Sequence, residues 1–133
     1  DMTEFFRALA DVKQDAPDVA TLRCAFYQDA LYQNHRGLFA DWLSAYAARL
    51  VTQQESDEAR RSRMNQVNPR FILRNYLAQQ AIDAAMQNDF SWIEKLLAAA
   101  RRPYDDDHPV ELIAKRPDWA LNKPGCSMLS CSS

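Results

Sequence analysis

Glycine is almost absent from this chain, and that scarcity limits what it can fold into more than any other feature. Gly37 and Gly125 are the only glycines among 133 residues, whereas alanine and leucine are frequent and runs of β-branched residues are missing. Alanine and leucine favour helices, while strands prefer β-branched and aromatic residues. The composition therefore predicts an all-α fold, an irregular bundle of about five helices.

Apolar residues recur with helical spacing in the first half of the chain. The stretches that show this spacing are residues 2–12, 19–33 and 38–51. Asp18 suits the N-cap of the second helix, and Gly37 is expected to make a turn before the third. In the third helix, this spacing relates Leu38, Trp42, Ala45, Tyr46 and Leu50, and we expect the aromatic residues among them to lie in the core.

The second half opens with a strong helix-start signal, "NPRFIL". Asn68 suits an N-cap and Pro69 the first helical position, where the missing N–H costs nothing. We expect a long central helix from there to about Asn88, buried on more than one face. Ser91 and Glu94 have the capping-box spacing and predict a last helix.

The C-terminal segment differs from the rest, because residues 102–133 contain four of the six prolines and little periodicity. It is predicted to be an extended tail with one short turn near residues 110–115, following a helical domain over residues 1–101. The first residue is Asp1 and helical spacing begins at once. We therefore expect the chain to be a piece of a longer protein.

Charge and hydropathy exclude several classes of function. The net charge is −2 and the pI about 5.6, so there is no basic field for nucleic acid. No apolar run approaches the roughly 18 residues of a membrane span, and no signal peptide is recognisable. The cysteines at 24, 126 and 131 lack C-x-x-C spacing, which argues against a disulfide scaffold or zinc site and favours the cytoplasm.

Catalytic motifs are missing from the sequence: it has no glycine-rich phosphate loop, no H-E-x-x-H and no G-x-S-x-G. We expect no catalytic, cofactor-binding or metal-binding residue in this segment. The run "DDDH" at residues 105–108 has ligand-type side chains, but such an acidic run is more often solvated. His35 has no identifiable partner in the sequence.

An arginine-rich stretch is the strongest local charge feature, since residues 59–82 contain no acidic residue. Its arginines are Arg60, Arg61, Arg63, Arg70 and Arg74. They could form a positive patch that docks a phosphate or an acidic surface. The alternative is a solvated face or one that forms salt bridges between domains.

The chain ends in "SMLSCSS", in which the cysteine, Cys131, is the third residue from the C-terminus. A terminal tail has little structure to hide a thiol, so Cys131 is the candidate redox residue. Cys126 is a possible second thiol five positions earlier. Cys24 lies within the predicted second helix, where a cysteine usually acts as a small core or surface filler.

Four ordered motifs resemble the C-terminal region of the selenoprotein O family. They are "MNQVNPRFILRNYLAQQAIDAA" from Met64, "RPYD" at 102–105, "RPDWA" at 116–120 and the final "SCSS". The resemblance implies a bacterial parent enzyme with a kinase-like, pseudokinase core that transfers AMP from ATP to protein hydroxyl groups with Mg²⁺. The family ends in cysteine or selenocysteine followed by two serines, which this resemblance places at Cys131.

The family's nucleotide-binding loop, metal ligands and catalytic aspartate belong to the upstream core, and Cys126 is not part of the family pattern. Two hypotheses follow. In the first, the chain supports that core and supplies a redox-regulatory thiol. Its partners are then the core itself and the protein substrates of the enzyme. In the second, it is an autonomous helical protein-interaction module with an incidental terminal cysteine.

Overall fold

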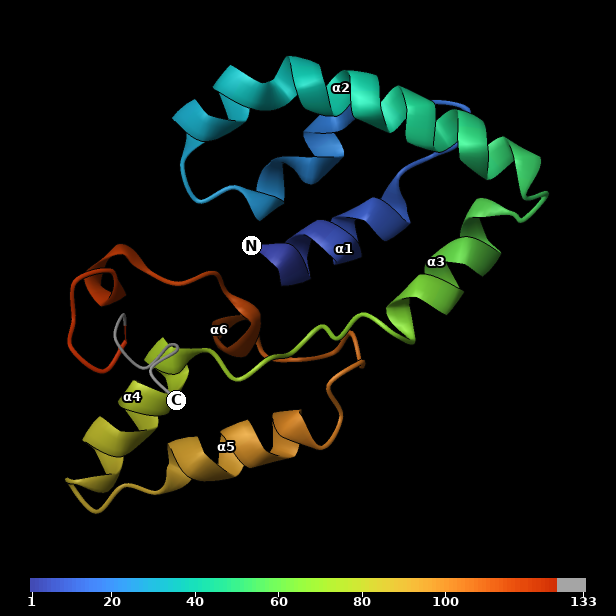
Figure 1. The fold of residues 1–133 in the computed structure, drawn as a ribbon. Helices are drawn as coiled ribbons and strands as arrows, with labels where there is room; N and C mark the ends of the chain where they lie inside the picture. The colour runs from blue at the N-terminus through green and yellow to red at the C-terminus, as the bar shows by residue number, and fades with distance from the viewer. Residues whose placement is uncertain (127–133) are drawn as a thin grey trace, which may run out of the picture. The chain divides into compact units, whose positions relative to one another are not determined.

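The computed structural model describes residues 1–126. These residues form six α-helices and two 3-10 helices joined by loops, with no strand among them (Figure 1). The predicted all-α fold is confirmed. The contacts divide the chain into two compact units, one from Asp1 to Pro69 and one from Arg70 onward. Within the described residues, no helix combines the length and apolar character that a membrane crossing requires.

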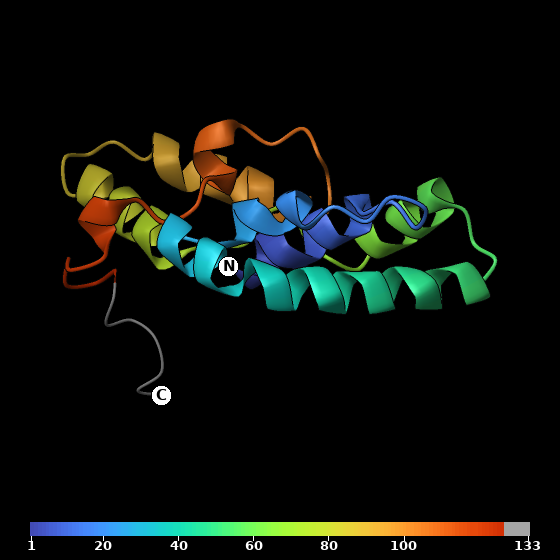
Figure 2. The ribbon, with the colours of Figure 1, turned by 90° about the horizontal axis from the view of Figure 1, so that it is seen from above.

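The first unit is built around a long helix, α2, with shorter helices packed beside it (Figures 1 and 2). Its elements are α1 (Met2–Asp11), the 3-10 helix η1 (Val19–Ala25), α2 (Asp29–Thr52) and α3 (Asp57–Asn65). The core joins α1, η1 and α2 through Leu9, Val12, Leu22 and Leu43. The predicted helix over residues 2–12 is therefore confirmed to within one residue.

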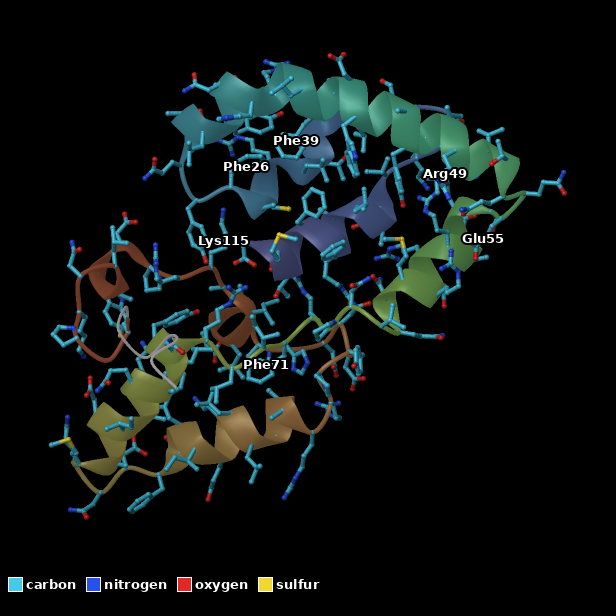
Figure 3. All side chains as sticks on the ribbon, in the orientation of Figure 1. Phe26, Phe39, Arg49, Glu55, Phe71 and Lys115 are labelled. Carbon is cyan, nitrogen blue, oxygen red and sulfur yellow. The ribbon has the colours of Figure 1, made fainter. Side chains whose placement is uncertain are left out.

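The predicted helix over residues 19–33 is wrong, because the chain leaves the helical conformation at Phe26. Asp18 does cap η1, since its Oδ1 accepts from Ala20 N at 2.9 Å. Phe26, however, is extended and packs its ring against Tyr32 and Phe39, with centroids 5.5 and 5.3 Å away (Figure 3). These aromatic contacts stabilise a break that local sequence does not signal.

The turn expected at Gly37 is also absent, because α2 runs through this residue. A glycine inside a helix costs only about 1 kcal/mol relative to alanine, which the packing of a long helix can offset. Residues 38–51 are helical as predicted, but Leu38 and Trp42 are exposed. Leu50, which belongs to the predicted apolar repeat, is buried, and so is Leu43, which does not.

The second unit comprises α4 (Asn75–Ala85), α5 (Ser91–Ala100), α6 (Val110–Ile113) and the 3-10 helix η2 (Asp118–Ala120). Its core is formed by Phe71, Tyr76, Leu77, Ala81, Leu96, Ala99, Leu112, Ala120 and Cys126. The last three of these belong to the segment predicted as an extended tail, which therefore packs into the core as far as Cys126. The short turn expected near residues 110–115 is α6, and the domain division after residue 101 stays a prediction.

The predicted start of the central helix at Asn68 and Pro69 is wrong, since α4 begins at Asn75. Backbone N–H groups of Arg70 and Phe71 donate to the Pro103 carbonyl at 2.7 and 2.9 Å, which holds them outside the helix. Asn68 instead donates its side-chain amide to a carbonyl of α3 at 2.8 Å.

The outer face of α4 is not buried as predicted, because Ile82 and Met86 are exposed. The helix α5 has the predicted bounds, but it does not start with a capping box. Ser91 is its first helical residue, and its N–H donates to the Asp89 carboxylate at 2.9 Å.

Candidate functional site

The segment that leads to the terminal cysteine is the part of the chain with the clearest chemical interest. Cys126, the last described residue, is buried in the core of the second unit. Cys131 lies outside the described residues, so its role as a redox thiol stays a prediction. The same holds for Cys126 as a second thiol.

An ion pair joins this segment to α4. The ammonium of Lys123 lies 2.6 Å from Asp83 Oδ2, and the Gln79 side-chain amide donates to Asp83 Oδ1 at 2.7 Å. Lys123 also lies 5.5 Å from the centroid of the Trp119 ring, and its carbonyl accepts from Cys126 N at 3.0 Å. We call this set of Gln79, Asp83, Trp119 and Lys123 the tail anchor.

The electrostatics of the tail anchor keep both members of the ion pair charged. The hydrogen bond from Lys123, followed by that from Gln79, holds the pKa of the Asp83 carboxyl below its ordinary value of 3.8. The hydrogen bond to Asp83 raises the pKa of Lys123 above its ordinary value of 10.5. The pair is therefore fully ionised at neutral pH.

Gly125 turns the chain so that Cys126 enters the core. Its φ of +87° lies in the left-handed region, which glycine adopts without strain. A Cβ at this position would also collide with Oε1 of Gln79. One of the chain's two glycines thus occupies a position where both the backbone conformation and the available space favour it.

The covalent chain limits where the terminal thiol can act. Cys131 follows Cys126 by five positions. At about 3.6 Å per extended residue, its Cα can lie at most about 18 Å from that of Cys126. Any partner of Cys131 must therefore come within reach of this short tether from the core of the second unit.

Cys24, the third cysteine, is exposed on η1 rather than enclosed in an α-helix. Its Sγ lies 3.6 Å from the Thr21 carbonyl oxygen. The expectation of a small filler within a long second helix is thus only half right: the residue lies at the surface of a short 3-10 helix.

Three of the five arginines lie on α3, and they form salt bridges within the first unit rather than between domains. Arg60 is 2% exposed, and its Nη1 contacts Asp57 at 2.7 Å. Its Nη2 donates to the carbonyls of Ala10, at 3.4 Å, and Val12. Arg60 therefore joins the start of α3 to the end of α1.

The neighbouring arginines of α3 form exposed ion pairs. Arg61 Nε lies 2.6 Å from Asp11, and Arg63 Nη2 lies 2.6 Å from Glu55, whose pKa is lowered chiefly by this hydrogen bond. Arg70 and Arg74 belong to the second unit, and each has interactions of its own. The three arginines of α3 are paired with acidic side chains of the first unit, so they do not support the phosphate-docking interpretation.

The acidic run at residues 105–108 folds back on the arginine that precedes it. Arg102 Nη1 lies 3.1 Å from Asp105 Oδ2 and 3.7 Å from Asp107 Oδ2. His108 is buried, with Nε2 2.9 Å from the Arg102 carbonyl oxygen and its ring against Phe71. Among residues 1–126, no three side chains of the ligating types come close enough to hold a metal ion.

His35 is exposed, and its Nδ1 lies 2.9 Å from the carbonyl oxygen of Leu31 in the preceding turn of α2. This contact is local to the helix. The contact joins the His35 ring to a backbone carbonyl of its own helix and to no cysteine or acidic side chain among residues 1–126.

Comparison with known proteins gives matches along the whole chain. The family model described as protein adenylyltransferase SelO matches residues 1–101. Relatives described as protein nucleotidyltransferase YdiU come from Tolumonas auensis and Methylobacillus flagellatus, both 52% identical over 134 aligned residues, and from Azoarcus sp., 51% identical. Each alignment covers 100% of this chain but 26% of the relative, in its C-terminal region. The chain thus spans about a quarter of the length of these relatives.

Proposed function

This chain belongs to the SelO family of protein adenylyltransferases, and we propose that it forms the C-terminal helical part of an enzyme that transfers AMP from ATP to protein hydroxyl groups. The observation that carries the proposal is the 52% identity to a nucleotidyltransferase along the entire chain. This similarity favours the enzyme hypothesis over an autonomous interaction module.

In this proposal, the rest of the enzyme forms a kinase-like core that binds ATP and Mg²⁺. About three quarters of each relative lies outside the region that this chain matches, which leaves ample length for such a core. The part played by this chain is then structural support and regulation. Nucleotidyl transfer depends on close positioning of donor, metal and acceptor, so a support that shifts the core changes the rate.

The regulatory element of the proposal is the thiol of Cys131. Its place in a terminal Cys-Ser-Ser motif matches the family pattern, and the tail anchor holds the chain a few residues before it. Thiol–disulfide exchange with oxidised glutathione would join Cys131 to a cysteine of the core and tether the terminus, while the glutathione disulfide is reduced to two thiols. Reduced glutathione would reverse the exchange and release the terminus. The setting is a reducing bacterial cytoplasm, in which such a bond is transient.

A fusion protein tests the supporting role. This chain replaces the matching region of the Tolumonas auensis relative, and AMP incorporation into protein is measured with labelled ATP and Mg²⁺. We expect the fusion to transfer AMP, and the same relative truncated before this region to be slower by about tenfold or more. Equal rates for the fusion and the truncated protein would contradict a supporting role.

A further inference from the structure

An exposed apolar surface on the first unit has no role in the function proposed above. It consists of Met2 and Phe6, one turn apart on α1, and Leu38 and Trp42, one turn apart on α2. Their side chains are 64%, 39%, 70% and 43% exposed, respectively. We call these four residues the α1–α2 apolar ridge.

Phe5 connects the α1 part of the ridge to the α2 part. The Phe5 ring lies 5.4 Å from that of Phe6 and 6.0 Å from that of Trp42. Trp42 in turn stacks on Tyr46, with centroids 5.4 Å apart and planes 8° apart. The ridge therefore rests on packed aromatic rings and presents a preformed shape to a partner.

The pattern of α2 shows that its apolar surface exceeds what the first unit buries. Leu43 and Leu50 face the core of that unit. Leu31, Leu38 and Trp42 recur at helical spacing on another face and stay exposed. A helix that is apolar on more than one side is usually covered on more than one side.

We propose that the α1–α2 apolar ridge is the surface through which this chain docks against the catalytic part of the enzyme, an inference that rests on the proposed function. About three quarters of each relative is available as the occupant. In one polypeptide, the two parts meet at an effective concentration in the millimolar range. A covalently linked partner needs less buried surface than a separate second copy does.

Methionine oxidation tests this assignment, because the chain carries a matched pair of reporters. Met2 lies on the ridge, and Met86, 81% exposed, lies at the end of α4 in the second unit. The isolated chain and the fusion with the Tolumonas auensis relative are treated with hydrogen peroxide, and each sulfoxide is quantified by mass spectrometry. We expect Met2 oxidation to slow about fivefold or more in the fusion, with Met86 unchanged. Unchanged Met2 oxidation, or equal slowing of both, would overturn the proposal.

A charge on the ridge should reverse this protection. Leu38→Asp in the fusion is expected to return Met2 oxidation to the rate of the isolated chain. Val51→Asp is the control, since Val51 is 58% exposed and about 20 Å further along the same helix. Circular dichroism checks that both variants fold. Protection that survives Leu38→Asp, or is lost equally with Val51→Asp, would overturn the assignment.

Two further results separate the alternatives. If Met2 of the isolated chain becomes protected as its concentration rises, a second copy occupies the ridge and the proposal is wrong. Met2 protection in a fusion without AMP transfer would support docking while the proposed function fails. AMP transfer with an unprotected Met2 would overturn docking alone.

Discussion

Lys123 and Asp83, 40 positions apart in the sequence, form an ion pair of 2.6 Å that joins the C-terminal segment to α4. Lys123 lies three residues before the buried Cys126, so the pair helps to fix the point from which the terminal Cys-Ser-Ser sequence extends. In the proposed enzyme, this anchor determines which parts of the core the Cys131 thiol can reach.

The anchor should stabilise the chain in a pH-dependent way. The pKa of Asp83 is below its ordinary 3.8 in the folded chain, so its stabilising contribution is complete above that value and is lost as pH falls through the lowered pKa. We expect Asp83→Asn to lower the urea midpoint at pH 7 and to have a smaller effect near pH 2.5. An equal effect at both pH values would show that the pair does not stabilise the fold.

The two glycines should respond oppositely to alanine. Gly125→Ala places a Cβ at a φ of +87° and against Gln79, so we expect a loss of about 1–3 kcal/mol in the free energy of unfolding. Gly37→Ala meets no atom within 4 Å and lies inside α2, so we expect a gain of up to about 1 kcal/mol. Urea unfolding measures both, and a gain for Gly125→Ala would contradict the described turn.

Two adjacent arginines test whether α3 is held by its buried contacts. Arg60→Ala leaves the Asp57 carboxylate and the carbonyls of α1 without their buried partner, at a cost of about 3–5 kcal/mol. Arg61→Ala removes an exposed pair and should cost at most about 1 kcal/mol. Similar urea midpoints for the two variants would mean that the Arg60 contacts are not made in solution.

The cysteines should differ in their rates of alkylation. Cys24 is exposed and Cys126 is buried, so N-ethylmaleimide should modify Cys24 of the native, reduced chain at least about tenfold faster. Mass mapping assigns each site, and the difference should vanish in urea. Alkylation of Cys126 as fast as Cys24 in the native chain would show that the C-terminal segment is not packed as described.

Local signals predicted much of the fold. The helical spacing before Asp11 and between Ser91 and Ala100 was sufficient for α1 and α5, because neighbouring residues determine those helices. Prediction failed at Phe26 and at Asn68, where partners distant in sequence decide the conformation. The Pro103 carbonyl, for example, binds the N–H groups of Arg70 and Phe71, which the side chain of Asn68 would have capped at a helix start.

The candidate site shows the same division. The terminal motif predicts Cys131 from sequence alone, because a short family pattern is local, and this stays a prediction since Cys131 lies outside the described residues. The tail anchor was missed, since neither Lys123 nor Asp83 has a distinctive neighbourhood and only folding brings them together. The sequence groups Arg60 with the other arginines of a charged stretch. In the structure it is buried, and its carbonyl acceptors, Ala10 and Val12, are 50 and 48 positions away in the sequence.

The redox dependence of AMP transfer by the fusion with the Tolumonas auensis relative tests the proposed regulation most directly. The rate of AMP incorporation is measured after incubation with oxidised or reduced glutathione, for the unchanged fusion, for Cys131→Ser and for the control Cys24→Ser. We predict a rate that differs between the two conditions in the unchanged fusion and in Cys24→Ser, and a single rate in Cys131→Ser. An active fusion with no redox dependence, or one whose redox dependence survives Cys131→Ser, would contradict a regulatory role for this thiol.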